Sequence, residues 1–270
     1  MNILLTGGSS GIGLYFLKNI LINFKDCKIF LVSRSNKDYY EKIGISKINL
    51  KKIKIINREI SKLIGIDAVL DELKNVKIDI CINNAGAYFE SEFDQNINKS
   101  YILNAISPFL ISKIILKNNP KAKIINISSF LHKIISKKIL SYFDLKQENL
   151  NSHKTYALSK FLMNYLSEIL KEQYPLSVIL CVNPGIISSG FAMNNVTILR
   201  KLISKFRNII GKNPNKFVMR IINFLKNKII DFDISANKLL KEKENKFLIL
   251  EKITSNRSIK DILKNYQIEL

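Results

Sequence analysis

The sequence has few of the residues that bind transition metals or form disulfide frameworks. It contains three cysteines, Cys27, Cys81 and Cys181, and two histidines, His132 and His153. The cysteines lie in or beside apolar segments without Cys-x-x-Cys spacing, whereas a metal site needs clustered ligands. We therefore expect three buried free thiols, no zinc site and no disulfide framework.

Apolar runs of bilayer length are also absent, and the first residues pass from an apolar strand into glycines without the charged start of a signal peptide. No Pro/Gly-rich linker or internal repeat divides the chain, so one domain over residues 1–270 is the simplest prediction. A hydrophobic content of 47% can supply its core. We expect a globular, cytoplasmic protein.

Acidic residues are scarce beside basic ones: 22 Asp and Glu face 43 Lys and Arg, which gives a net charge of +21. A dense basic surface attracts polyanions at long range. The lysines are nevertheless scattered along the whole chain, and no basic cluster is interleaved with the stacking aromatics that single-strand binders use. We expect no nucleic-acid partner.

One basic segment is better organised. Residues 198–210 repeat apolar side chains at helical spacing and place basic side chains on the opposite face. Such a helix could make weak contact with a membrane surface, or it could cover a pocket as a lid. Its position in the chain favours a substrate lid, which we expect within residues 190–216.

Strand and helix patterns alternate along the chain. The expected strands cover residues 1–5, 28–32, 53–56, 78–82, 123–127, 177–182 and 246–250, and the expected helices cover 14–24, 62–74, 93–117, 153–173 and 215–226. This alternation predicts an α/β fold with a doubly wound parallel sheet, a Rossmann fold, covered by helices on both faces. Ligands are expected at the carboxyl ends of its strands.

A glycine-rich turn, Thr6-Gly7-Gly8-Ser9-Ser10-Gly11-Ile12-Gly13, follows the first expected strand and precedes a helix. Its glycines permit a tight turn with close backbone approach, and the helix start aims N–H groups at an anion. The turn predicts a dinucleotide pyrophosphate site, although a purely structural turn is the alternative. The predicted cofactor contacts are Gly7, Ser9, Ser10, Gly11, Ile12 and Gly13. Leu14 follows the last glycine, which excludes a Walker loop.

No acidic residue ends the second expected strand, where NAD sites carry one to bond the ribose. The residues there are Ser33 and Arg34. Arg34 can form a bidentate pair with a 2′-phosphate, with Ser33 as a second donor, so this pair predicts NADP(H) rather than NAD(H). The alternative for Arg34 is an ordinary surface residue.

Four motifs in order resemble the short-chain dehydrogenase/reductase superfamily. They are the turn from Thr6 to Gly13, Asn-Asn-Ala-Gly at 83–86, Tyr-x-x-x-Lys at 156–160, and Asn-Pro-Gly at 183–185. The resemblance extends from Met1 to about Leu250. Their order and spacing are far more specific than any one motif.

Within that superfamily, two further stretches resemble the retinol dehydrogenase and protochlorophyllide reductase branch. These stretches are Ser-Ser-Phe-Leu-His at 128–132 and Phe-Asp-Leu at 143–145. The long loop before Tyr156 is a further likeness. His132, where compact members usually carry Gly, is interpreted as a hydrogen-bonding loop residue rather than a catalyst.

The resemblance implies a catalytic set of Asn104, Ser129, Tyr156 and Lys160. Tyr156 would protonate the substrate carbonyl as a general acid, and Lys160, four residues later on the same helix face, would acidify the phenol and bond the nicotinamide ribose. Ser129, in preference to Ser128, would hold the substrate oxygen.

Asn104 has a separate argument from the sequence. Pro108 lies four residues later and has no N–H to donate to the Asn104 carbonyl, which leaves that carbonyl free within an expected helix. We hypothesise that it binds a water that connects Lys160 to solvent. A mere helix kink is the alternative.

The resemblance also implies further cofactor contacts. Asn83, Ala85 and Gly86 would brace the sheet and border the adenine ribose, and Glu59 stands where the family usually has an Asp that touches adenine. Pro184, Gly185, Ile187 and Ser189 would border the nicotinamide, with Ser189 in place of the usual Thr.

Together these features predict an NADP(H)-dependent oxidoreductase that transfers a hydride between nicotinamide and an apolar carbonyl or alcohol substrate. A homo-oligomer is the family expectation. The alternative is a non-catalytic NADP(H)-sensing protein of the same fold, and the intact catalytic set counts against it.

Overall fold

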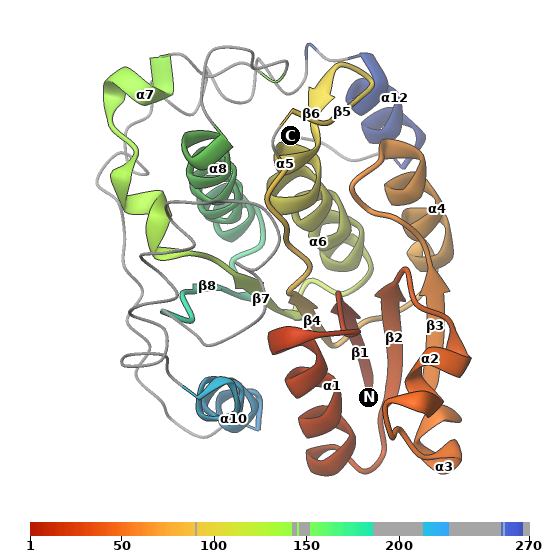
Figure 1. Ribbon diagram of the computed structural model, residues 1–270. Coiled ribbons are helices and arrows are strands. Elements are labelled where there is room, and N and C mark those ends of the chain that lie inside the picture. Colours follow the sequence, from red (N-terminus) through yellow and green to blue (C-terminus); the bar gives the residue numbers. More distant parts are fainter. Residues whose placement is uncertain are drawn as a thin grey trace.

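A six-stranded sheet forms the centre of the molecule in the computed structural model, which describes residues 1–89, 91–141, 145, 152–185, 213–226, 255 and 257–266 (Figure 1). In sheet order the strands are β3 (Ile53–Asn57), β2 (Lys28–Ser33), β1 (Asn2–Thr6), β4 (Ile80–Asn83), β7 (Lys123–Ile127) and β8 (Val178–Val182). All neighbouring strands run parallel. The strand expected over 246–250 lies outside the described residues.

The strand order confirms the predicted doubly wound fold. From β1 the chain builds outward through β2 to β3, and it then returns to the other side of β1 to add β4, β7 and β8. The winding direction therefore reverses between β1 and β4. In such sheets the carboxyl ends of the two strands at the reversal border the ligand crevice.

Helices cover both faces of this sheet (Figure 1). One face carries α4 (Leu63–Leu73), α6 (Ser107–Asn118) and α8 (Ser152–Gln173), with α12 (Arg257–Asn265) against α4; the other carries α1 (Gly11–Asn23), α2 (Lys37–Lys42), α3 (Lys47–Leu50) and α10 (Pro214–Leu225). Side chains of β1 alternate between the two layers: Leu4 packs in the first, and Ile3 and Leu5 pack in the second. Burial on both faces explains why the strands are apolar throughout.

The helical segment Lys99–Asn118 is long and apolar enough to cross a membrane, with a mean hydropathy of 1.2. However, 94% of this apolar window is buried inside the molecule, and α6 contributes to the hydrophobic core between the sheet and α4. Its composition is that of a helix enclosed by protein on all sides.

The predicted start of that helix at residue 93 is wrong. β5 (Phe93–Asp94) and β6 (Ile97–Asn98) instead pair as an antiparallel hairpin. Its turn residues, Gln95 and Asn96, have φ values of 50° and 62°, in the left-handed region that two-residue hairpin turns require. The pattern of apolar residues alone did not reveal this turn.

Two short helices, α2 and α3, occupy the connection between β2 and β3, where no helix was predicted. Each has a side-chain N-cap: Asn36 accepts from the Tyr39 N–H, and Ser46 accepts from the Asn49 N–H. Helices of this length have too few turns to establish a clear apolar period in the sequence.

The cysteines largely match their prediction. Cys27 and Cys81 are buried free thiols, and Cys181 is free but half-buried. Burial raises the pKa of each thiol. Within the part of the chain that the structure describes, no group of three or more His, Cys, Asp or Glu side chains is arranged to hold a metal ion.

Candidate active site

Two glycines of the glycine-rich turn, Gly7 and Gly13, have backbone atoms where a side chain would stand. Gly7 has a φ of 72°, in the left-handed region, and a Cβ on Gly13 would lie 1.9 Å from the Gly7 carbonyl oxygen. Ser10 is the N-cap of α1, yet its side chain makes no capping hydrogen bond, so it leaves the N–H groups of the first turn uncapped. These features fit a dinucleotide pyrophosphate against the backbone and helix start.

A second loop, which follows β4, packs directly against this turn. The Asn84 side-chain amide donates to the carbonyls of Thr6 (3.1 Å) and Gly7 (2.9 Å), and the Ala85 N–H donates to the Thr6 hydroxyl (3.0 Å). A Cβ on Gly7 would lie 2.8 Å from the Ala85 Cα. The carboxyl ends of β1 and β4 are thus joined at the point where the winding of the sheet reverses.

Ser33 and Arg34 stand at the end of β2 as predicted, but only Arg34 is exposed. The Ser33 hydroxyl is buried beneath α2, where it accepts from the Tyr40 phenol (2.8 Å) and from the Ser35 N–H (3.0 Å). Tyr39 on the same helix donates to the Ser9 carbonyl (2.8 Å) and so ties α2 to the glycine turn. No sequence signal marked these two tyrosines.

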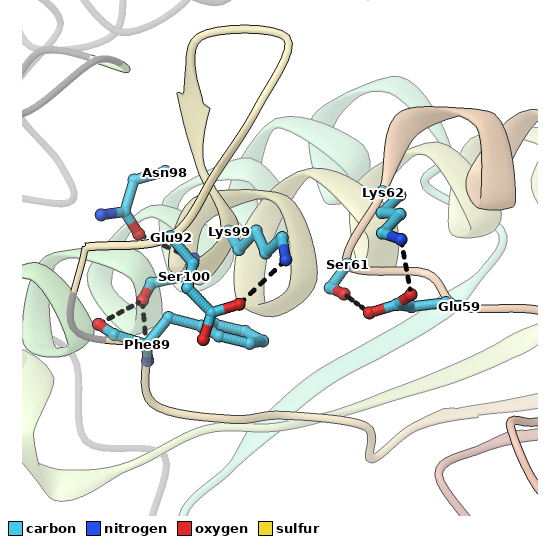
Figure 2. A network of polar contacts seen from close by, with 8 residues as sticks. All are labelled: Glu59, Ser61, Lys62, Phe89, Glu92, Asn98, Lys99 and Ser100. Atoms are coloured by element: carbon cyan, nitrogen blue, oxygen red, sulfur yellow. Dashed lines mark hydrogen bonds and ion pairs between the residues drawn. The ribbon is translucent and has the colours of Figure 1, made fainter. Parts of the chain in front are cut away.

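Glu59 lies just beyond β3, and its carboxylate is held at the start of α4 (Figure 2). It accepts from the Ser61 hydroxyl (2.8 Å) and pairs with the Lys62 ammonium (3.2 Å). The Ser61 hydrogen bond is the main reason that the pKa of Glu59 is lowered, with burial opposing it. The structure therefore shows a structural role for the Glu59 carboxylate.

A second ion pair in Figure 2 supports the loop after Gly86. The Lys99 ammonium contacts Glu92 (2.9 Å) and lies 5.9 Å from the centroid of the Phe89 ring. The hydrogen bond to Glu92 raises the pKa of Lys99. The Ser100 hydroxyl also accepts from the Phe89 N–H (3.4 Å), so this loop is fastened to the beginning of α5 (Lys99–Tyr101).

Asn104 sits in the middle of a π-helical turn, η1 (Ile102–Ile106), inserted between α5 and α6. The Ser107 N–H donates to the Ile102 carbonyl, five residues back. Pro108 follows directly, and the wider π turn accommodates a residue that can neither donate to the Asn104 carbonyl nor fit its ring against that turn. The anticipated irregularity is present in the helix at this point.

The Asn104 side chain makes three hydrogen bonds to two neighbours, Ala87 and Ser159. Its Nδ2 donates to the Ala87 carbonyl (2.8 Å) and to the Ser159 hydroxyl (3.1 Å), and its Oδ1 accepts from the Ala87 N–H (3.2 Å). Ser159 donates in turn to the Tyr156 carbonyl (2.7 Å). Asn104 thus links the loop after β4 to the helix that carries Tyr156; Ser159 was not among the predicted site residues, although it lies inside the Tyr-Ala-Leu-Ser-Lys stretch.

Ser129 and Tyr156 meet from different elements, the end of β7 and the first turns of α8. Tyr156 is 8% exposed, and its ring centroid lies 6.1 Å from that of Tyr88. Burial raises the pKa of Tyr156, and a hydrogen bond from Ser129 opposes part of that rise. The His132 ring Nδ1 donates to the Ser129 carbonyl, which confirms its interpretation as a hydrogen-bonding residue, although it lies in the 3₁₀ helix η2 (Phe130–Ile134) and not in a loop.

Lys160 is buried one turn further along α8. Its ammonium donates to the Ile127 carbonyl (2.9 Å) and lies 6.0 Å from the centroid of the Tyr156 ring. Burial lowers the pKa of Lys160 to about 8. A Cβ on Gly86 would lie 3.2 Å from this ammonium and 3.0 Å from the Asn104 Oδ1, so Gly86 lies beside both side chains.

The remaining predicted contacts fall at the end of β8 and beyond. Pro184 and Gly185 are partly buried, and the Gly185 N–H donates to the Asn183 Oδ1 (2.9 Å). Ile187 and Ser189 lie outside the described residues. So does the predicted lid, apart from residues 213–216 at the start of α10.

Asn83 has a structural position beneath the site. Its buried amide donates to the Asn126 Oδ1 (2.8 Å) on β7 and to the Ser112 hydroxyl (3.0 Å) on α6. It braces the sheet, as predicted.

Comparison with known families and structures is consistent with this geometry. The short chain dehydrogenase family model matches residues 1–143, which is more than half of the 270 residues. The match ends before Tyr156 and Lys160, so the interpretation of these two residues depends on their spacing and geometry. No curated protein matched the sequence.

Several solved structures share the fold. A short-chain dehydrogenase/reductase from Saccharomyces cerevisiae is 21% identical, with a TM-score of 0.64 over 85% of this chain and 92% of that one. A short-chain dehydrogenase from Sphingobium yanoikuyae in complex with NADPH is 15% identical, with a TM-score of 0.61 over 93% and 94%. A 4-hydroxyisoleucine dehydrogenase complexed with NADH is 18% identical, with a TM-score of 0.63 over 83% and 90%. The chain belongs to the short-chain dehydrogenase family of oxidoreductases, which bind nicotinamide cofactors on a Rossmann fold.

Proposed function

We propose that the protein catalyses NADP(H)-dependent hydride transfer between nicotinamide and a small, largely apolar carbonyl or alcohol substrate. The observation that carries the proposal is the convergence of three side chains near the carboxyl end of β7: Tyr156 and Lys160 are buried, and Ser129 is half-buried beside them. Asn104 is linked to the same helix through Ser159. Buried titratable side chains with perturbed pKa values gather at catalytic sites more often than elsewhere.

The glycine turn and the start of α1 would hold the cofactor pyrophosphate, because the N–H groups at a helix start attract an anion. Gly13 lets the backbone of the turn pack closely there, since a Cβ at this position would overlap the Gly7 carbonyl oxygen. Arg34, exposed at the end of β2, would pair with a 2′-phosphate. When bound, the nicotinamide supplies or accepts the hydride. The preference for NADP(H) rests on Arg34 because the Ser33 hydroxyl is held by Tyr40.

In the reducing direction, Tyr156 donates its phenolic proton to the substrate oxygen as that oxygen gains negative charge. Burial raises the pKa of Tyr156, so the phenol is protonated at neutral pH, which is the state a general acid requires. Ser129 would donate a hydrogen bond to the same oxygen. In the oxidising direction the phenolate is needed, and the nearby Lys160 ammonium would favour it.

Reprotonation of Tyr156 requires a path to solvent. We infer that it runs through Lys160 and a water bound by the Asn104 carbonyl, which Pro108 cannot engage. The π-helical turn supports this path because its five-residue bond, from the Ser107 N–H to the Ile102 carbonyl, interrupts the regular α-helical pattern around Asn104.

The substrate class is the least constrained part of the proposal. The likeness of the Ser128–His132 region and the following loop to the retinol dehydrogenase branch supports an apolar substrate, covered by residues 190–216. A cytoplasmic homo-oligomer is the matching expectation for the whole protein.

The test is NADPH oxidation with a panel of aliphatic and aromatic aldehydes and ketones, with Tyr156→Phe measured in parallel. We expect Tyr156→Phe to lose about 10²- to 10⁴-fold in kcat while retaining NADPH affinity, because the phenol oxygen is removed but the fold is unchanged. Turnover that is unaffected by Tyr156→Phe would contradict the proposal. Tight NADPH binding without Tyr-dependent turnover would instead favour a cofactor sensor.

A further inference from the structure

Three buried polar contacts join α8 to β7 and to Ser128, the residue after it. Lys160, Asn164 and Ser167 are spaced by four and three residues, so they lie on one face of α8. The Asn126 Nδ2 donates to the Ser167 hydroxyl (2.8 Å), and the Lys160 ammonium donates to the Ile127 carbonyl (2.9 Å). The Ser128 hydroxyl donates to the Asn164 Oδ1 (2.8 Å). We call these contacts the polar seam.

The seam lies in an apolar interface. Its side chains are at most 5% exposed, and they are surrounded by core residues of α8 such as Phe161 and Leu162. A shift of α8 along its own axis by one turn, about 5.4 Å, would separate all three pairs. Because an unpaired buried polar group costs about 1–3 kcal/mol, the seam favours a single axial position for α8.

The Ser128–Asn164 bond is the contact of the seam nearest to the chemistry. Ser128 directly precedes Ser129, and its own N–H donates to the Val182 carbonyl (2.8 Å), which fixes it to β8. On α8, Tyr156, Lys160 and Asn164 are each four residues apart and lie on one face of the helix. Asn164 therefore connects the strand end that carries Ser129 to the helix that carries Tyr156.

We propose that Ser128 and Asn164 are positioning residues, whose hydrogen bond holds α8 at the axial position in which the Tyr156 phenol meets the Ser129 hydroxyl. Neither side chain contacts the reacting atoms, and both act through their neighbours. This inference rests on the proposed function, because it concerns the same tyrosine.

The kinetic test compares Ser128→Ala, Asn164→Leu and the double variant. We expect each single change to lower kcat about 10- to 100-fold with little change in the KM for NADPH, because small misplacements of reacting groups are costly. The double variant should be no slower than the slower single variant, since both changes break one contact. Ser128→Thr, which keeps the hydroxyl, should recover most of the activity.

Ser167→Ala is the matched control. It removes a seam contact of the same length, 2.8 Å, but one located further along α8 from Tyr156. It should lower the melting temperature, Tm, about as much as Ser128→Ala while retaining kcat. Full activity in Ser128→Ala, or losses that multiply in the double variant, would overturn the proposal.

A second measurement does not depend on turnover. In protein labelled with ¹³C at the tyrosine Cζ, the Tyr156 resonance is assigned by its loss in Tyr156→Phe. Its chemical shift reports the hydrogen bond with Ser129, so it should move in Ser128→Ala and Asn164→Leu but not in Ser167→Ala. An unmoved resonance in the first two variants would overturn the positioning role even if no tested carbonyl is a substrate; a moved resonance with no turnover would support positioning and contradict only the proposed reaction.

Discussion

The two halves of the sheet build their parts of the site by different means. On the side of β1 to β3, the glycine turn is formed by backbone atoms in close contact, as in the approach of Gly13 to the Gly7 carbonyl. On the side of β4 to β8, buried polar side chains hold the site together through hydrogen bonds, as in the Asn83–Asn126 pair and the polar seam.

This difference predicts different responses to mutation. On the cofactor side, β1 to β3, backbone atoms are in close contact, so added side-chain atoms should lower both stability and cofactor affinity. Loss of an exposed side chain there should weaken only its contact with the cofactor. Hydrogen-bond networks are limited by pairing, so the catalytic side should be most sensitive to loss of a polar atom. The following predictions test that contrast, beginning with the largest expected effect.

Ser129→Ala should have the largest effect among these four, with kcat reduced by about 100-fold or more, because one donor to the developing charge on the substrate oxygen is lost. The same change should raise the pKa of Tyr156 further, since the Ser129 hydrogen bond lowers it. Steady-state kinetics and the binding of NADPH measured by fluorescence check both halves of the site. Ser129→Thr, which keeps the hydroxyl, should retain activity. A large loss of NADPH affinity in Ser129→Ala would contradict the separation of the cofactor side from the catalytic side.

Arg34→Ala should raise the KM for NADPH by about 10- to 100-fold, because a charge-assisted contact to the 2′-phosphate is worth about 1.5–3 kcal/mol. The KM for NADH and kcat should stay within about twofold, since Arg34 is exposed and β1 and β4 lie between its strand, β2, and β7. The ratio of the two KM values is the measurement. Equal effects on both cofactors would show that Arg34 does not distinguish them. Lys37→Ala, also an exposed cation on the same connection, is the charge-matched control.

Gly13→Ala should weaken NADPH binding by about tenfold or more and lower the stability by about 1–3 kcal/mol, because its Cβ requires a backbone shift. Gly8→Ala is the control: its Cβ would meet the Cδ1 of Leu31 at 2.6 Å, and that side-chain end can move. Calorimetric titration and thermal unfolding compare the two variants. Equal tolerance of both alanines would remove the steric argument for this side of the sheet.

Lys160→Met tests stability rather than turnover, and its expected effect is small: a rise in Tm of a few degrees at neutral pH. Burial lowers the pKa of Lys160 to about 8, below its ordinary value of 10.5. Below about pH 8 the lysine is charged in both folded and unfolded states, and its burial destabilises the fold; between about pH 8 and 10.5 the folded state loses the proton first, and the penalty disappears.

The difference in Tm between Lys160→Met and the wild type should therefore shrink as the pH rises from about 7 to 10. Replacing the partly exposed Lys171, which pairs with Glu168, by Met should give no such pH dependence. A difference that grows with pH would reverse the assignment of the buried ammonium as a cost to stability.

Much of the fold followed from local patterns. The strands and α1 were predictable because a parallel sheet covered on both faces needs continuous apolar runs. The hairpin of β5 and β6 was not, because a turn at Gln95 and Asn96 interrupts a sequence whose apolar spacing otherwise suits a helix. The helices α2 and α3 were missed because short helices carry little periodic signal.

The candidate site shows the same division. The positions of Tyr156, Lys160 and Arg34 followed from motif spacing and the strand to which each belongs. The engagement of Ser33 by Tyr40 did not, because this hydrogen bond depends on how α2 returns to the end of β2. Spacing identifies which residues share an element, but not which partners neighbouring elements bring to them.

The sequence by itself therefore determined the parallel sheet, the phosphate turn and the residues available for proton transfer, because strand periodicity, glycine sterics and helical spacing are local properties. Only the tertiary structure decided where α8 rests along β7, and with it the contact between Ser129 and Tyr156. That position depends on hydrogen bonds between buried groups such as Ser128 and Asn164, which are 36 residues apart in the chain. Their pairing is enforced by the cost of leaving either group unpaired in an apolar core.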